Sequence, residues 1–307
     1  MRTLQFTVTP DYDNRKALHF LRGSAGLSCH LVRQLKVLPD GILCNGEPVR
    51  TIDPVHTGDI LTVHLPEDLP TVEPAAAPHR SIDVLYEDED LLILNKPGDL
   101  AVHPTHNHQG DTLANLVAAY LLEEGRPSVF RAIGRLDKGT SGIVICALHS
   151  YAASRLQGKV QKTYDAFPSG LYEGTGTIEL PIYRPDPGKT LRAAGEPDLE
   201  RYPQASAPDH AVTHWKALAA GPDYSWLNVQ LETGRTHQIR VHFAALGTPL
   251  LGDDMYGAPP FPGLSRHALH CGRAVFDHPV TGEEMTVTAP LPPDLAALTE
   301  RLDKYSR

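Results

Sequence analysis

The sequence lacks any long apolar run. No stretch of about 18 uncharged apolar residues occurs in its 307 residues, so we expect no membrane-spanning helix. The first residues also lack the apolar segment of a secretion signal, which leads us to expect a cytoplasmic protein. Apolar residues make up 41% of the chain and charged residues 21%, the usual proportions of a globular protein with a sizeable core.

Cysteine is scarce, and its spacing argues against both a zinc site and a disulfide framework. The four cysteines are Cys29, Cys44, Cys146 and Cys271, and no two of them have C-x-x-C spacing. Cys146 lies inside an apolar run that is typical of a strand. We therefore expect buried, reduced thiols and no bound metal.

Positive charge is also in short supply. The chain has 28 basic and 37 acidic residues, a net charge of −9, which argues against a protein that binds nucleic acid over a generally basic surface. Residues 1–66 are nearly balanced, with seven basic and six acidic residues, so the excess acid lies in the rest of the chain. A nucleic-acid site would have to be a basic cleft inside an acidic envelope.

Spaced prolines mark a domain boundary. Pro66, Pro70, Pro74 and Pro78 surround a run of three alanines, a composition that favours an extended, semi-rigid linker. We predict a small domain over residues 1–66, a linker over 67–80 and a larger domain over 81–307.

The pattern of the first 66 residues resembles an S4-type RNA-binding domain. Short helices are predicted over 15–21 and 31–35, followed by a hairpin at Asn45-Gly46 and a strand over 60–65. Arg33 and Lys36, near the end of the second helix, are the candidate RNA contacts. A small packing domain with no ligand is the alternative.

Residues 81–307 predict one mixed α+β domain. A short strand is expected over 91–94, and a helix from Asp111, its expected cap, to Gly125. Alternating apolar residues predict a strand over 227–231, and Thr236 is expected to cap a helix that ends at Gly247. Residues 183–210, rich in proline, glycine and charge, predict a long surface excursion.

The segment Gly134–Gly142 places a carboxylate, Asp137, in a loop just before the apolar run 143–148. Functional carboxylates often lie in such loops, where a strand holds them at the surface. An Asp bonded to its own backbone in a turn would give the same local pattern, so Asp137 needs supporting evidence from elsewhere.

Two further motifs provide that support. Residues 160–166 alternate along a predicted strand, so Lys162 and Tyr164 face the same side, as suits a flat polar ring bound beside a phosphate. Arg235, in the motif Thr233–His242, lies at a strand-to-helix turn. We expect it to pair with Asp137 and keep that carboxylate ionised.

These three motifs, in this order and at this spacing, resemble the RluA-type pseudouridine synthases. The resemblance extends over residues 81–295 and includes four further segments: Tyr86–Asp88, Leu94–Gly98, Gly247–Asp253 and Arg266–His270. It implies a catalytic domain with a mixed, mainly antiparallel central sheet.

The resemblance also implies a role for each site residue. Asp137 would be the essential nucleophile, and Arg235 would pair with it. Tyr164 would stack on the target base and take part in proton movement, Arg135 would enter the RNA stack as the base leaves it, and Lys162 would lie near phosphate.

The resemblance further implies a monomer that acts on structured RNA without a cofactor. The S4-like domain favours ribosomal over transfer RNA. The family usually has histidine where this chain has Gly134, so a contact made by that imidazole is missing. Three alternatives stay open: a synthase acting on transfer RNA, a non-catalytic RNA-binding or ribosome-assembly factor, and a glycosidase that uses Asp137 with a second carboxylate.

A cluster of histidines, His103–His108, suggests a metal site. No carboxylate or cysteine completes a ligand set within it, so we expect a solvated loop near the cleft instead.

Overall fold

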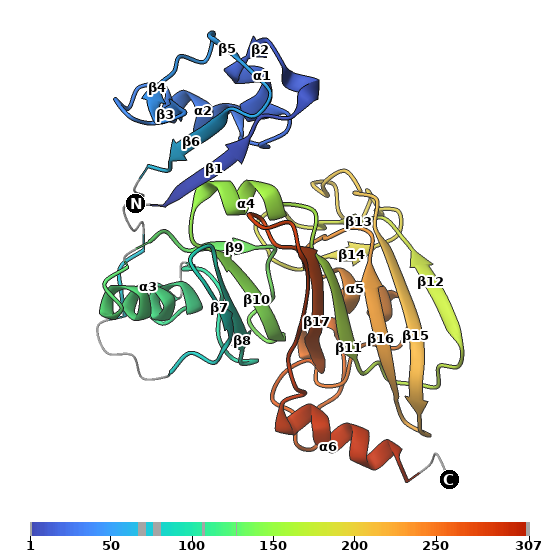
Figure 1. Ribbon diagram of the computed structural model, residues 1–307. Helices are drawn as coiled ribbons and strands as arrows, with labels where there is room; N and C mark the ends of the chain where they lie inside the picture. Colours follow the sequence, from blue (N-terminus) through green and yellow to red (C-terminus); the bar gives the residue numbers. More distant parts are fainter. Residues whose placement is uncertain (1, 67–71, 76–80, 106–107, 127, 305–307) are drawn as a thin grey trace.

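The computed structural model describes residues 2–66, 72–75, 81–105, 108–126 and 128–304, and it contains two separate main cores. Figure 1 shows the first unit above the large sheet of the second. Of the predicted linker 67–80, residues 67–71 and 76–80 lie outside the described residues. Ala75, within the linker, is buried in the core of the large unit.

The first unit is an antiparallel sheet of order β1-β6-β3-β4 with two short helices. Asn45 and Gly46 have φ values of 52° and 90°, the left-handed pair that a tight hairpin needs, so the predicted hairpin is confirmed. A separate pair, β2 and β5, completes the unit. Its elements are β1 (Thr3–Thr7), β2 (Arg15–Lys16), α1 (Ala17–Arg22), α2 (Cys29–Leu35), β3 (Ile42–Cys44), β4 (Glu47–Pro48), β5 (Pro54–Val55), β6 (Ile60–His64) and a 3-10 turn (Pro10–Tyr12).

The large unit is built on one ten-stranded sheet of mainly antiparallel order β12-β15-β16-β11-β17-β10-β8-β7. β18 pairs with β17 and β9 with β10, so the predicted α+β class with a mixed sheet is confirmed. Its strands are β7 (Val84–Glu87), β8 (Leu91–Lys96), β9 (Arg131–Ile133), β10 (Ser141–Ala147), β11 (Gln161–Ala166), β12 (Thr175–Glu179), β15 (Val212–Ala220), β16 (Ser225–Leu231), β17 (Leu269–Asp277) and β18 (Glu284–Thr288).

One pair of parallel strands in this sheet determines where the site forms. β10 runs parallel to β17, with Ser141 opposite His270 and Gly142 opposite Cys271. Gly142 has φ +105°, and a Cβ there would lie 2.2 Å from the carbonyl oxygen of Cys271, so only glycine fits. Because parallel strands start at the same edge, the loop before β10, which carries Asp137, lies beside the loop before β17.

In the described part of the large unit, four helices accompany the sheet: α3 (Leu113–Glu123), α4 (Ser150–Leu156), α5 (Gln238–Ala245) and α6 (Pro293–Leu302). The predicted caps of two are wrong. Thr112 caps α3 through a reciprocal pair of bonds with Asn115, whereas Asp111 pairs with His108. α5 begins after His237, not at Thr236, because His237 takes a left-handed conformation.

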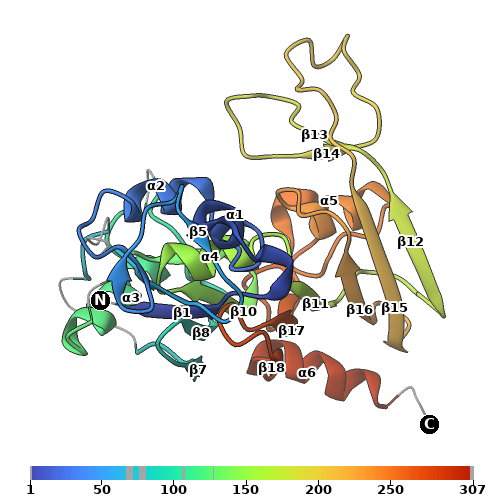
Figure 2. The ribbon, with the colours of Figure 1, turned by 45° about the horizontal axis from the view of Figure 1, so that its top comes forward.

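The predicted excursion is present. The two-residue strands β13 (Ile182–Tyr183) and β14 (Ala193–Ala194) pair at its base, and most of the rest is irregular. Figure 2 shows it standing out from the body beyond α5.

Two expectations from composition can be compared with the structure. No helix among the described residues is long and apolar enough to cross a membrane. Cys146 and Cys271 are buried free thiols, but Cys29 is exposed at the start of α2 and Cys44 is half-buried, so the expectation of burial is wrong for these two residues.

Candidate active site

A cleft of about 1130 Å³ opens where the loop before β10, the strand β11 and the start of α5 meet. All five site residues predicted in the large unit line it: Arg135, Asp137, Lys162, Tyr164 and Arg235. Arg33 and Lys36 lie away from it, exposed at the end of α2. The three sequence motifs therefore share one cavity.

The partner of Asp137 is Arg240, not Arg235. The Nη1 of Arg240 lies 3.2 Å from Oδ2 of Asp137. The Nε of Arg235 donates instead to the backbone oxygen of His210, and its Nη1 lies 3.7 Å from Asp209 on the exposed rim. The expected ion pair of Arg235 is wrong because Arg235 precedes the turn into α5. Arg240 lies in the first turn of that helix, on its buried side.

Arg240 is fixed by a second carboxylate. Its Nε and Nη2 each lie 2.7 Å from an oxygen of Asp253, a bidentate pair, and its guanidinium lies 5.0 Å from the ring centre of Tyr256. The motif Thr233–His242 contained Arg240, but its spacing alone did not single it out. Tyr256 lies in the 3-10 turn Asp254–Tyr256 and Asp253 directly precedes it, and sequence reasoning assigned them no role.

The two carboxylates differ in exposure. The side chain of Asp253 is 0% exposed, whereas that of Asp137 is 22% exposed and faces the cleft. Burial opposes the charge of Arg240, but its bonds and attraction to Asp253 and Asp137 outweigh burial and raise its pKa above the ordinary value. Arg240 thus stays cationic beside one closed and one accessible carboxylate.

Three contacts hold the turn that follows Asp137. Lys96, which is fully buried, donates to the carbonyl of Lys138 at 3.1 Å, and Arg266 donates to the carbonyl of Gly139 at 2.8 Å. The hydroxyl of Thr140 lies 2.9 Å from Nε2 of His267. Arg266 and His267 reach this loop because β10 and β17 run parallel. The loop is therefore preorganised by distant parts of the chain.

Tyr164 and Lys162 enter the cleft from β11. Burial above all, followed by the charges of Cys271 and Asp137, raises the pKa of Tyr164 well above its usual value, so its phenol stays protonated. The Nζ of Lys162 lies 3.5 Å and 3.4 Å from the carbonyls of Ile133 and Ile143, on the two strands that flank the Asp137 loop. Lys162 thus braces this loop from the side of the cleft.

The backbone conformation at position 134 explains why glycine stands there. Its φ is +74°, the left-handed region that glycine adopts without strain, and the only atom near an added Cβ would be the Nζ of Lys162 at 3.7 Å. The backbone angle, more than lack of space, therefore favours glycine here.

The sequence profile described as RNA pseudouridylate synthase matches residues 90–245. A relative from Bacillus subtilis (strain 168), the uncharacterized RNA pseudouridine synthase YlyB, is 34% identical over 99% of both chains. The chain belongs to the RNA pseudouridylate synthase family. The predicted RluA-type resemblance is confirmed, and the protein is an RNA pseudouridine synthase that isomerises uridine in RNA.

Other relatives of this RNA pseudouridine synthase agree. The Ribosomal large subunit pseudouridine synthase D of Vibrio parahaemolyticus is 34% identical, over 73% of this chain and 71% of that protein. Among solved structures, Human RNA Pseudouridylate Synthase Domain Containing 1 superposes with a TM-score of 0.55 at 26% identity, covering 73% of this chain and 95% of that one.

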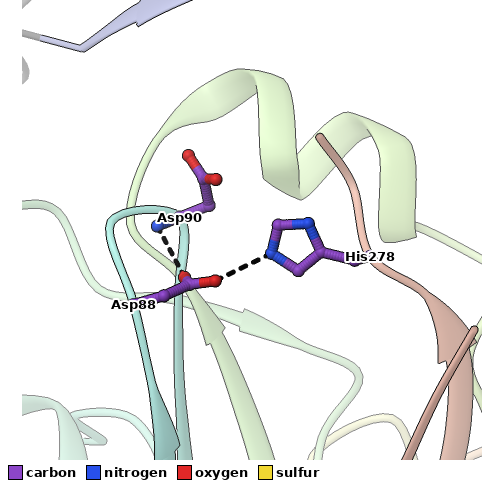
Figure 3. A group of neighbouring side chains, drawn as sticks. All are labelled: Asp88, Asp90 and His278. Atoms are coloured by element: carbon purple, nitrogen blue, oxygen red, sulfur yellow. Dashed lines mark hydrogen bonds and ion pairs between the residues drawn. The ribbon is translucent and has the colours of Figure 1, made fainter. Parts of the chain in front are cut away.

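One cluster of the synthase has the composition of a metal site. Figure 3 shows Asp88, Asp90 and His278 close together, and none of the three lines the cleft. Asp88 accepts bonds from the Tyr86 hydroxyl and two backbone amides, and contacts His278 at 2.9 Å. Arg2 donates to Asp90 at 2.8 Å. The guanidinium of Arg2 thus already supplies a cation to this cluster. Because Arg2 belongs to the first unit, these bonds connect the two units of the synthase.

The histidine segment was expected to form a loop near the cleft. Residues 106–107 lie outside the described residues. His103 lines the cleft and packs edge-on against Phe130, whereas His108 lies 2.7 Å from Asp111 and 3.0 Å from Nζ of Lys138. These contacts account for both side chains without a metal.

We expect Lys96→Met to destabilise the synthase by several kcal/mol. The buried ammonium of Lys96 donates to the carbonyls of Pro97, Leu100 and Lys138, and a hydrogen bond from a charged group contributes about 1.5–3 kcal/mol. Chemical denaturation measures the change. Exposed Lys189→Met is the control, with an effect within about 0.5 kcal/mol. Equal midpoints for both variants would contradict the bracing role.

Proposed function

We propose that this synthase converts uridine to pseudouridine in ribosomal RNA, with Asp137 as the nucleophile. The observation that carries the proposal is the Asp253–Arg240–Asp137 chain of charges, which ends in a carboxylate open to the cleft. The guanidinium of Arg240, 3.2 Å away, orients this carboxylate at the cleft, and a nucleophile must be held in such a fixed position.

The isomerisation needs no redox group besides these side chains. The bond from C1′ to N1 of the uracil breaks, the base turns, and C5 bonds to C1′, with no net oxidation or reduction. Asp137 could attack C1′, add to C6, or assist elimination at the sugar, and all three need its ionised form. Tyr164 would stack on the extruded base, and Arg135 would fill the space that the base leaves, which offsets a few kcal/mol of unstacking.

The glycosidase alternative needs a second free acid. Besides Asp137, the cleft lining in the described chain includes one other carboxylate, Glu232, whose Oε1 lies 2.6 Å from Nε2 of His214. Asp253 is closed off by Arg240. Of the two acids in the described cleft lining, Asp137 lies beside the guanidinium of Arg240 and Glu232 beside a histidine, which suits isomerisation better than hydrolysis by two carboxylates.

The rim of the cleft suits a polyanion. Arg192, on the excursion, lies near Arg184 and Arg135; its pKa is lowered first by burial and then by the charges of these two guanidiniums, although Tyr256 opposes this. None of the three arginines forms an ion pair with another described residue. Uncompensated positive charge in a chain of net charge −9 is best explained by contact with phosphates.

Replacing Arg184 and Arg192 together by glutamine should raise KM for RNA and leave kcat nearly unchanged. Each lost phosphate contact lowers the slope of log affinity against log salt by about 1, so the double variant should lose about 2. Binding measured over a salt series tests this. The control is Arg301→Gln, on α6, whose guanidinium lies over Phe261. An unchanged salt slope would refute the rim as a phosphate site.

Ribosomal RNA is proposed as the substrate on two grounds. The Vibrio parahaemolyticus relative is named for the large ribosomal subunit. The first unit presents Arg33 and Lys36 on its surface, where an S4-like domain would contact RNA. The cytoplasmic location and the monomeric state stay predictions.

Pseudouridine mapping of cellular RNA, in cells with and without this synthase, tests the substrate. We expect sites in ribosomal RNA to disappear with the gene and return with the wild-type protein. Loss confined to transfer RNA would favour the alternative substrate, and an unchanged map would favour a non-catalytic assembly factor.

A further inference from the structure

His237 occupies an unusual position beside Asp137. It is the residue before α5, in a left-handed conformation with φ 59° and ψ 17°, and its side chain is 11% exposed. Its Nε2 lies 3.8 Å from Oδ2 of Asp137, and its Nδ1 lies 2.9 Å from the hydroxyl of Tyr256. A non-glycine residue in this conformation is held there by its contacts, which points to a function.

The bonds of Tyr256 determine which ring nitrogen of His237 carries the proton. The backbone N–H of Arg192 donates to the Tyr256 hydroxyl at 3.2 Å, so the oxygen is an acceptor there. The hydroxyl has one proton of its own, and Nδ1 of His237 at 2.9 Å is within reach to accept it. When Nδ1 accepts, the proton of the neutral ring is on Nε2, the nitrogen that faces Asp137.

We propose that Tyr256 is a positioning residue that holds His237 as the Nε2–H tautomer, so that this N–H donates to the carboxylate of Asp137 when RNA is bound. The proposal rests on the proposed role of Asp137. It gives that carboxylate a second hydrogen-bond donor besides Arg240. The N–H of His237 only binds and orients the carboxylate, and no covalent bond forms or breaks at the ring.

The surroundings of His237 favour a neutral ring. The charged groups that act on it are Asp137, Arg240, Arg192 and Asp253. Burial is the largest influence, and with Arg240 and Arg192 it outweighs the two carboxylates and lowers the pKa of His237. A neutral ring has only one N–H, so its tautomer decides whether Asp137 receives a donor at all.

The separation of 3.8 Å is longer than a hydrogen bond. Contacts in an active site are often loose without substrate and shorten in the complex. The backbone N–H of Arg192 anchors the Tyr256 hydroxyl, and its side chain belongs to the excursion that we propose to contact RNA phosphates. RNA binding and the orientation of His237 thus share a residue.

Nitrogen-15 NMR of the histidine side chains tests the tautomer directly, in the full-length protein and without an activity assay. His237→Gln identifies the signals of His237. We expect Nε2–H in the wild type and a mixture of tautomers in Tyr256→Phe, which keeps the ring over Arg240 but lacks the hydroxyl. Nδ1–H in the wild type, or an unchanged tautomer in Tyr256→Phe, would overturn the proposal.

Activity gives a second test. The side-chain nitrogen of Gln can take the place of Nε2, whereas that of Asn reaches only the place of Nδ1. We expect His237→Asn to lower kcat on the order of 10- to 100-fold, with little change in KM, and His237→Gln to lower it less. Backbone strain alone would give the opposite order, with the smaller loss for Asn, because Asn tolerates the left-handed conformation better than Gln.

Tyr86→Phe, which loses a bond to Asp88 outside the cleft, is the control and should match the wild type. Equal losses for Gln and Asn, or a smaller loss for Asn, would overturn the donor role. If the wild type itself formed no pseudouridine in ribosomal RNA, the proposed function would fail, and the NMR result would still decide the tautomer.

Discussion

Asp137→Asn should lower pseudouridine formation on the order of 10³-fold or more and leave the fold intact. The substitution removes the negative charge but keeps the shape of the side chain. Arg240 retains its bidentate pair with Asp253, so no buried charge loses its partner. Nucleoside mass spectrometry of ribosomal RNA after a single-turnover reaction measures the loss, and thermal unfolding checks the fold.

The control for this prediction is Glu232→Gln, which removes the other carboxylate of the cleft lining. Glu232 is exposed and paired with His214, so we expect less than a tenfold change in rate, since exposed pairs contribute only about 0–1 kcal/mol. Should Asp137→Asn keep its activity while Glu232→Gln loses it, Asp137 would not be the nucleophile. Free uracil or an abasic sugar in the product would indicate hydrolysis instead.

The second large effect concerns the two arginines of the motif Thr233–His242. Arg240→Met should destabilise the synthase by about 3–5 kcal/mol and abolish activity, because it leaves the fully buried Asp253 without its bidentate partner. Arg235→Met should change stability by less than about 1 kcal/mol, since its contact with Asp209 is exposed. Urea denaturation of the two variants makes the comparison.

A double variant separates the charge effect from simple loss of packing. Arg240→Met combined with Asp253→Leu removes the uncompensated carboxylate, so part of the stability should return while activity stays absent. If Arg235→Met were the more damaging single change, the assignment of Arg240 as the partner of Asp137 would be wrong.

Local patterns predicted much of the fold. The Asn45-Gly46 hairpin, the strand over 227–231 and the helix ending near Gly125 depend on neighbouring residues, through turn angles and the spacing of apolar side chains. The helix caps were less predictable. Asp111 and Thr112 are both good caps, and the choice depended on Asn115 and on His108, which draws Asp111 away.

The spacing of residues along the chain did not predict which arginine pairs with Asp137. Arg235 and Arg240 are five residues apart, and both precede or enter the same helix. Only the left-handed turn at His237 sets the direction in which α5 leaves, and so which guanidinium is buried beside Asp137. Asp253 then fixes that guanidinium from a separate segment of the chain, a contact that no local rule predicts.

The sequence by itself determined the family, because the family is recognised from short motifs whose order and spacing are read along the chain: the segments that contain Asp137, Tyr164 and Arg240. Only the tertiary structure decided their partners. The parallel pairing of β10 and β17 brings Arg266 and His267 to the Asp137 loop. The 3-10 turn Asp254–Tyr256 brings Tyr256 to His237. Such contacts depend on strand order and helix direction, which are properties of the packed chain as a whole.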